Sequence, residues 1–279
     1  MMKKALAFIF LTASFSSHAG LFDSSPELKC GNDNSVNAFK EWIYSDALSQ
    51  LQDTYIKSPA VFYKIPLATY EKQLQSIPVE LENVLTEAQQ DESKSANCVA
   101  KVSFGVPAAT LELVQSLPAN LEYITQGDGQ LFNKKVVWKN VNFKIQFADN
   151  QKDIIVTADN STNSLPRSMY NMATLAVKKD RLIESSQQSD LSYIENLYKQ
   201  NDRELNRIWS ALPDSIRSGM KKEQQSWVAK KVTTCGKLSD AQSTTLSNAE
   251  RIKIYQCQNQ VTVARIEQLN GEEGNNLPD

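Results

Sequence analysis

The stretch that decides the fold is 198-YKQNDRELNRIW-209, the densest part of a helical pattern that runs through residues 191–269. Around it, apolar side chains recur three and four positions apart, as they do on one face of a helix with a coiled-coil-like seam. These positions are Leu191, Ile194, Tyr198, Asn201, Leu205, Ile208 and Leu212, of which only Asn201 is polar. The helix is expected to end at Leu212, because Pro213 disfavours helical geometry in the residue before it.

Two further helices are predicted after this one. The second begins near Ser215, ends at Cys235 and has a broadly apolar side made by Ile216, Met220, Trp227 and Val228. A polar connection, residues 233–248, leads to a third helix from about Ala249, in which Ile254, Cys257, Val261, Arg265 and Leu269 are three and four apart. The sequence therefore predicts a small three-helix bundle with two cysteines.

Each of these helices carries a motif. The motif residues are Tyr198, Asp202, Leu205, Asn206 and Trp209 in the first helix, Gln224, Trp227 and Cys235 in the second, and Cys257, Val261, Thr262, Arg265 and Leu269 in the third. In this order and spacing they resemble the LprI-like lysozyme inhibitor domain, a secreted bacterial helical module. The chain has Lys231-Val232 where such domains often have Arg-Asp, and lacks their usual cysteine pair before the first helix. The resemblance covers under a third of the chain and implies a partner, a lysozyme or related peptidoglycan hydrolase.

The motif residues are open to two interpretations. We interpret Tyr198, Leu205, Trp209 and Trp227 as core, and expect Thr262 to bond to backbone or to a neighbouring side chain. The polar residues Asp202, Asn206, Gln224 and Arg265 form either a ligand surface or, as we favour, a network that fixes the packing of the three helices.

A group of basic residues is the second candidate site. Its members are Arg217, Lys221, Lys222, Lys230, Lys231 and Lys237. Such a group is usually a solvated face. Lysozyme, however, works with two carboxylates in a cleft, so an inserted Lys or Arg is also a candidate partner-binding residue.

Residues 1–19 have the features of a secretory signal peptide. Lys3 and Lys4 precede an apolar run at residues 5–15, and Ser17-His18-Ala19 forms a small-x-small cleavage site. The run is about half the length that a membrane span requires, and no cysteine for lipid attachment follows the cleavage site. We expect a periplasmic or secreted protein without a membrane span.

Composition excludes several functions. The only histidine, His18, lies in the predicted signal peptide, so no histidine is left for catalysis or metal ligation. There is no glycine-rich phosphate loop, and we expect neither a cofactor nor a metal.

Four cysteines predict disulfide bonds in an oxidising compartment. Three connectivities are possible. The one that keeps each bridge within a domain joins Cys30 to Cys98 and Cys235 to Cys257.

Charge is uneven along the chain. Residues 21–165 contain 18 acidic and 12 basic residues, a balance of −6, whereas residues 166–279 contain 14 and 16, a balance of +2. Because the protein is acidic and has no basic stripe, nucleic acid is not an expected partner. A cationic partner fits the acidic half.

Residues 20–166 predict a separate α+β domain of no family that we recognise. A helix is expected at residues 34–55, with an apolar face made by Phe39, Trp42, Ile43, Leu48 and Leu51. Two strands are expected within residues 78–104, a helix at 108–124, and a hairpin of strands around 141–147 and 154–158. The expected result is an antiparallel sheet of about four strands with helices on one face.

The remaining segments are less patterned. Residues 159–167 are predicted as a loop, residues 169–183 fit either a helix or a strand, and residues 184–190 are predicted as a linker. We accordingly place a connecting segment at 167–190, the helical domain at 191–270 and a disordered tail at 271–279.

Three functional hypotheses follow from the sequence. The first, which rests on the resemblance, is a non-catalytic inhibitor that binds lysozyme or another muramidase, including an immunity protein against a wall-degrading toxin. The second is a cell-envelope interaction module whose specificity lies in the α+β domain. The third is an enzyme such as a glycosidase with paired carboxylates, which we do not favour because no carboxylate pair stands out.

Overall fold

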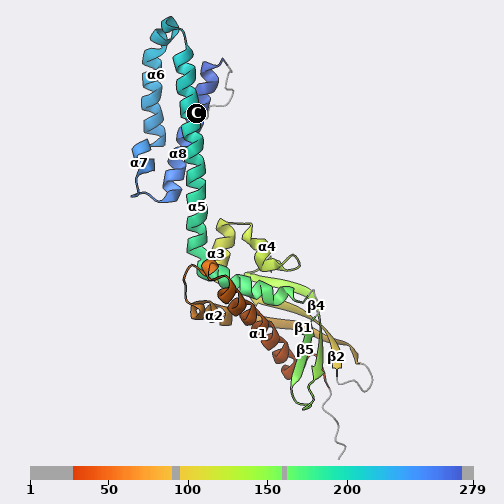
Figure 1. Cartoon of the computed structure of the whole chain (residues 1–279). Helices are drawn as coiled ribbons and strands as arrows, with labels where there is room; N and C mark the ends of the chain where they lie inside the picture. The colour runs from red at the N-terminus through yellow and green to blue at the C-terminus, as the bar shows by residue number, and fades with distance from the viewer. Residues whose placement is uncertain (1–27, 90–94, 159–161, 272–279) are drawn as a thin grey trace, which may run out of the picture.

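The long helix α5 (Ser164–Ala211) joins a sheet part to a helical part in the computed structural model (Figure 1). The structure describes residues 28–89, 95–158 and 162–271. The predicted signal peptide at residues 1–19 and residues 272–279 of the predicted tail lie outside the described residues. We use "sheet part" for the elements that precede α5 together with its N-terminal portion, and "helical part" for the remainder of α5 with the helices that follow it.

The sheet part contains one antiparallel sheet of five strands. The strands are β1 (Val79–Gln89), β2 (Ser95–Gly105), β3 (Gln130–Phe132), β4 (Lys135–Phe147) and β5 (Ile154–Ala158). β1 pairs with β2 and β2 with β4. On the other edge of β4, β3 pairs with residues 135–137 and β5 with residues 143–147. The predicted α+β class with an antiparallel sheet is confirmed. The expected number of strands was one too few, because β3 has only three residues and no alternating pattern that the sequence could display.

Helices cover one face of this sheet because apolar side chains alternate along its central strands. In β2 the buried side chains include Cys98, Val102 and Phe104. The helix α1 (Asp33–Lys57) packs on them with a buried stripe, and the Phe39 ring lies 3.9 Å from that of Phe143 in β4. This stripe consists of Ser35, Phe39, Ile43, Ala47 and Leu51. The predicted helix at residues 34–55 is confirmed.

Smaller helices complete the sheet part. The 3-10 helix η1 (Pro59–Phe62) and α2 (Leu67–Gln75) were not predicted; they bring Phe62 and Tyr70 into a buried edge-to-face contact. The single helix predicted at residues 108–124 is wrong, because the structure has α3 (Ala108–Ser116) and α4 (Asn120–Thr125). Pro118 disfavours helical geometry at Leu117, which has φ −132° and ends α3.

The helix α5 corrects two predictions and decides a third. Residues 164–167 are helical rather than part of a loop, and residues 184–190 are helical rather than an irregular linker. Residues 169–183, which fitted either a helix or a strand, are helical. Residues 159–161 of the predicted loop lie outside the described residues. Pro166 is compatible with a first helical turn, and Met169, Met172 and Ala173 are buried against the sheet part. Residues 184–190 continue the helix because the helical turns before them pack on the sheet part and those after them pack on α8.

The helical part contains α6 (Asp214–Cys235), α7 (Leu238–Gln242) and α8 (Asn248–Leu269) beside the C-terminal half of α5 (Figure 1). A small core is formed by Leu191, Ile194, Tyr198, Ala241 and Tyr255. The short helix α7 lies in the segment that was predicted as a polar connection. Ser247 and Glu250 form a reciprocal capping box at the start of α8.

Both predicted disulfide pairings are confirmed. Cys30 is joined to Cys98, which fixes the segment before α1 to the centre of the sheet. Cys235 is joined to Cys257, which fixes the end of α6 to α8. The described residues contain no free cysteine.

Candidate functional site

The motif residues of the helical part meet around the buried side chain of Lys231 in α6. Its ammonium group donates a hydrogen bond to Thr262 Oγ1 of α8 at 3.0 Å and to Tyr198 Oη of α5 at 3.4 Å. It also lies 3.8 Å from Asp202 Oδ1 of α5. One cation therefore contacts all three helices.

Two aromatic rings complete the surroundings of this cation. The Lys231 nitrogen lies 5.0 Å from the centre of the Tyr198 ring and 5.1 Å from that of Trp227, within the range of cation–π attraction. Lys231 is only 7% exposed. Burial lowers the pKa of Lys231, and the nearby Asp202 carboxylate acts in the opposite direction.

Asp202 organises the polar groups on α5. Tyr198 Oη donates to its Oδ1 at 3.2 Å, and Asn206 Nδ2 donates to its Oδ2 at 3.3 Å. Burial, and then the neighbouring Asp202 charge, raise the pKa of the Tyr198 hydroxyl. The phenol therefore stays protonated and can donate to Asp202 while it accepts from Lys231.

Arg265 of α8 makes a second junction with α6. Its Nη1 donates to Glu223 at 2.6 Å and its Nε donates to Gln224 at 3.0 Å. Its guanidinium carbon lies 5.9 Å from the centre of the Trp227 ring. Arg265 is 4% exposed, whereas the Glu223 side chain is 60% exposed, so this junction reaches from the interior of the helical part to the solvent.

Amide side chains add two more links between the helices. Asn201, the polar member of the apolar stripe on α5, donates to Asn259 of α8 at 2.8 Å. Gln258 Nε2 donates to the carbonyl of Gly236, just after α6, at 2.6 Å. Partly buried polar pairs of this kind favour one register of helix packing over others.

The apolar residues of the motif lie wholly or partly inside the helical part. Leu205 is buried, whereas Trp209, Trp227 and Leu269 are half-buried. Together with the polar contacts above, this arrangement supports our favoured interpretation of the motif as a packing network.

The basic candidate residues are not one surface. Lys231 was one of the candidates for contact with a partner, but its ammonium is buried among Tyr198, Trp227 and Thr262 and is used within the chain. Arg217 is bonded to Asp214 and donates to the carbonyl of Ser210 at 3.0 Å. The remaining candidates on α6, Lys221, Lys222 and Lys230, are exposed.

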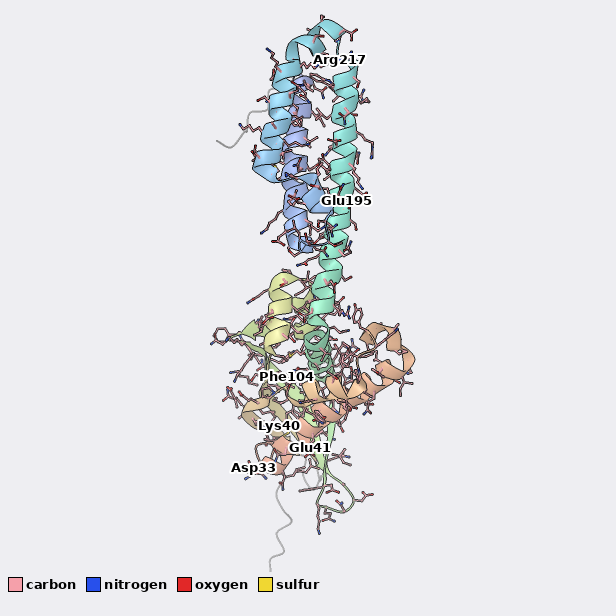
Figure 2. All side chains as sticks on the ribbon, turned by 90° about the vertical axis from the view of Figure 1, so that its left-hand side faces the viewer. Asp33, Lys40, Glu41, Phe104, Glu195 and Arg217 are labelled. Atoms are coloured by element: carbon pink, nitrogen blue, oxygen red, sulfur yellow. A yellow bond between two sulfur atoms is a disulfide. The ribbon has the colours of Figure 1, made fainter. Side chains whose placement is uncertain are left out.

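Arg217 lies near the free end of the helical part, far from the sheet (Figure 2). Glu195 marks the end of the helical part that is nearer the sheet in the same view. The turn between α5 and α6 is thus the most distant point of the described chain from the sheet, and Ile216 is 49% exposed beside it.

The interactions of this site are hydrogen bonds, ion pairs and cation–π contacts within the chain. Within residues 28–89, 95–158 and 162–271, no group of three or more His, Cys, Asp or Glu side chains is placed to hold a metal ion. A search of the helices in the described ranges finds none that combines the length and apolar character of a membrane span.

Several residues of the network were not predicted from sequence. Glu223, Gln258 and Asn259 carry no motif of their own, and Lys231 was assigned to the wrong environment. Asn201 was the one available indication, because an amide on an apolar stripe needs a polar partner on the facing helix.

Fold and site together define a two-part α+β protein whose C-terminal helices are held by a disulfide and a buried polar network. Residues 183–269 match the family model for Lysozyme inhibitor LprI. The C-terminal region therefore carries this domain, as its resemblance predicted, and the match begins eight residues before the predicted start at residue 191. No curated protein and no solved structure matches the chain.

Proposed function

We propose that this protein is an exported inhibitor of lysozyme or a related muramidase, and that it acts by binding the enzyme rather than by catalysis. The observation that carries the proposal is the match of residues 183–269 to a lysozyme inhibitor family. Two disulfides support export, because such bonds persist in oxidising compartments such as the periplasm or the cell exterior.

The contact surface that we propose is the exposed side of α6 with the turn that precedes it. The internal network uses Lys231 and Arg265, which leaves Lys221, Lys222 and Lys230 free to approach another protein. A lysozyme cleft contains two carboxylates, so lysines at the protruding end of the helical part have complementary charge. The acidic half of the chain would supply the long-range attraction to an enzyme that is cationic as a whole.

Inhibition of wall lysis by residues 20–279 tests this proposal. Against c-type, g-type and bacterial muramidases, we expect saturable inhibition of at least one class that weakens as salt is raised. The double variant Lys221→Glu, Lys222→Glu should weaken inhibition at least about 10-fold, because it places two like charges against the cleft. Absence of inhibition by the folded, oxidised protein in all three classes would overturn the proposal.

A matched charge reversal in the sheet part separates this function from the second candidate. That candidate is a non-catalytic envelope interaction or immunity module whose specificity lies in the sheet part, and the exposed Leu85 and Phe132 favour it. Lys144 and Lys152 are exposed lysines of the sheet part. Their double change to Glu should leave inhibition within about 2-fold of the parent if α6 makes the contact. A larger loss in this variant than in the α6 variant would favour the second candidate.

A further inference from the structure

The sheet has a second face, opposite the one that the helices cover, and no helix of the described chain lies on it. Side chains that point to this face alternate with buried ones along the strands. In β2 they are Asn97, Val99 and Lys101, each of which stands between buried neighbours in the sequence. We call this surface the open face.

The open face is apolar at its centre. A face of an antiparallel sheet that is in contact with water usually carries polar side chains. Here Leu85 of β1 is paired with Val99 of β2 and is 62% exposed, and Phe132 of β3 is 67% exposed. These three side chains and Val137 of β4 line one hollow of about 640 Å³. An exposed apolar surface that spans neighbouring strands indicates an interaction site.

The charged side chains of the open face are divided between its two sides, acidic on β1 and basic on β4. Two ion pairs establish that these side chains point to the same face. Lys135 of β4 reaches over β2 to Glu80 of β1, and Lys101 of β2 bonds to Glu82 of β1 at 2.8 Å. The two outer strands therefore carry opposite charge, with β2 between them.

Other charges of the open face are left without an ion pair. Glu87 of β1 and Lys144 of β4 line one hollow together with Asn97 of β2, and both are exposed. Lys139 of β4 is exposed at the apolar hollow. Within residues 28–89, 95–158 and 162–271, none of these three charges has an oppositely charged partner. They are available to a second molecule.

We propose that the open face is the interface of a dimer in which two copies of this chain pack their sheets face to face. A two-fold axis directed along β2 places β1 of each protomer over β4 of the other, because β2 lies between these strands. The strand registers then bring Glu87 opposite the partner's Lys144, since Asn97 of β2 is level with both. Val99 meets the partner's Val99 at the axis.

The charge pattern selects a second copy as the occupant. An unrelated protein would need a basic strand and an acidic strand at the same spacing, whereas a second copy supplies both by symmetry. The size also fits. Strands of 11 residues in four positions across the sheet give a face of roughly 700 Å², from about 3.4 Å per residue and about 4.8 Å between strands. Standard interfaces bury about 800 Å² per partner.

Sedimentation equilibrium of residues 20–279, without any lysozyme, tests the dimer. We expect a reversible monomer–dimer equilibrium with a dissociation constant below about 100 μM, as befits an interface of standard size with a mixed apolar and charged surface. A protein that stays monomeric up to about 300 μM would overturn the proposal. The dimer is independent of the inhibitor function proposed above, because α6 lies far from the sheet (Figure 2).

Charge reversals decide whether the open face makes the dimer. Glu87→Lys and Lys144→Glu should each weaken dimerisation at least about 10-fold, because each variant places like charges opposite one another twice. An equal mixture of the two variants should form a heterodimer within about 3-fold of the parent affinity, because every basic residue at these positions then faces an acidic one.

The matched control is Lys72→Glu, the same reversal at an exposed residue of α2, which packs on α1 and α5. It should dimerise as the parent does. Both test positions are exposed, so the variants are expected to fold. Parent-like dimerisation of the two single variants, or a mixture of them that stays monomeric, would overturn the assignment of the dimer to the open face.

Discussion

Lys231 is the residue whose environment departs most from what its type suggests. A lysine is almost never fully buried unless its charge is paired. Here the charge has a partial partner in Asp202 at 3.8 Å, two hydroxyl acceptors and two aromatic rings. Because the Asp202 side chain is 39% exposed, the Lys231–Asp202 pair lies next to the solvent rather than deep in the interior. Its main effect is to hold α6 against α5 and α8.

We predict that Lys231→Ala lowers the free energy of unfolding by about 1–3 kcal/mol, because it removes both the cation and the aliphatic stem that packs on Trp227. Lys231→Met keeps a stem of similar volume and should cost less than about 1.5 kcal/mol. Urea titration followed by circular dichroism measures both. Lys222→Ala, on the exposed side of the same helix, is the control and should change stability by no more than about 0.5 kcal/mol. Equal effects of Lys231→Ala and Lys222→Ala would contradict the role given to Lys231.

At this scale the sequence predicted the network but not all of its members. Asp202, Gln224 and Arg265 were recognised because they belong to the motif that resembles the LprI-like domain. Lys231 was not, because the apolar pattern of α6 is weak. Ile216 and Val228, which were placed on the apolar side of this helix, are 49% and 47% exposed. The side of α6 that faces its neighbours is therefore set by polar contacts, which hydrophobic periodicity does not reveal.

Tyr70 gives a prediction for alkaline pH. Its side chain is fully buried and its hydroxyl donates to the Phe62 carbonyl at 3.0 Å. Burial, with smaller contributions from the neighbouring tyrosines 55, 63 and 170, raises the pKa of Tyr70 to about 12 from its ordinary value of 10.0. The unfolded chain therefore loses this proton first. The stability that Tyr70 contributes is complete below about pH 10 and is lost as pH rises towards about 12.

The midpoints of urea unfolding, measured from about pH 9 to about pH 12, test whether the stability that Tyr70 contributes is lost as pH rises. We expect Tyr70→Phe to be less stable than the parent at the lower end, by about 1 kcal/mol for the lost hydrogen bond. Its stability should then fall less steeply with pH than that of the parent. Identical slopes in the two proteins would show that Tyr70 does not contribute to the alkaline transition.

At the scale of elements, the longer strands and the helix α1 were predictable, whereas β3, α2 and the connecting portion of α5 were not. The alternation in β2 and the apolar stripe of α1 are patterns in the local sequence, and the same residues are buried in the structure. Residues 184–190, with their Ser and Gln side chains, have no apolar face, and isolated from the chain they would form only a marginal helix. They are helical because α5 is packed on the sheet part before them and on α8 after them, which is a tertiary effect.

The disulfide at the end of α6 gives a further prediction on stability, because this helix buries few side chains. Only Lys231 and Cys235 of α6 are buried. We expect the double variant Cys235→Ser, Cys257→Ser to lose about 3 kcal/mol, the chain-entropy value for a bridge between residues 22 apart. Amide hydrogens of α6 should then exchange faster while those of the sheet keep their protection.

The other disulfide is the matched control for this experiment. Cys30→Ser with Cys98→Ser opens a bridge between residues 68 apart, which on the same account costs about 4 kcal/mol. Its effect should appear in α1 and β2 and leave exchange in α6 unchanged. Faster exchange of α6 in this control would mean that the two parts unfold together rather than separately.

For the whole molecule, α5 is the element that sets the distance between the two parts. Its 48 residues span about 72 Å at the usual rise per residue. The acidic sheet part and the basic end of the helical part are held at opposite ends of this helix (Figure 2). An enzyme bound at the turn between α5 and α6 would therefore lie away from the sheet part.

Breaking α5 between the two cores tests whether that separation matters. Ser185 is exposed and lies in the helical segment that joins them. Ser185→Pro removes one helical hydrogen bond and introduces a steric clash, at a local cost of about 3 kcal/mol, and should kink the helix without unfolding either core. Small-angle X-ray scattering should then show a smaller radius of gyration than in Ser185→Ala, the control that keeps the helix straight. If α6 alone contacts the enzyme, as we propose, both variants should inhibit wall lysis within about 2-fold of the parent. Loss of inhibition in Ser185→Pro alone, with both cores folded, would instead mean that the enzyme is held by the two parts together, and that the length and direction of α5 are part of the binding surface.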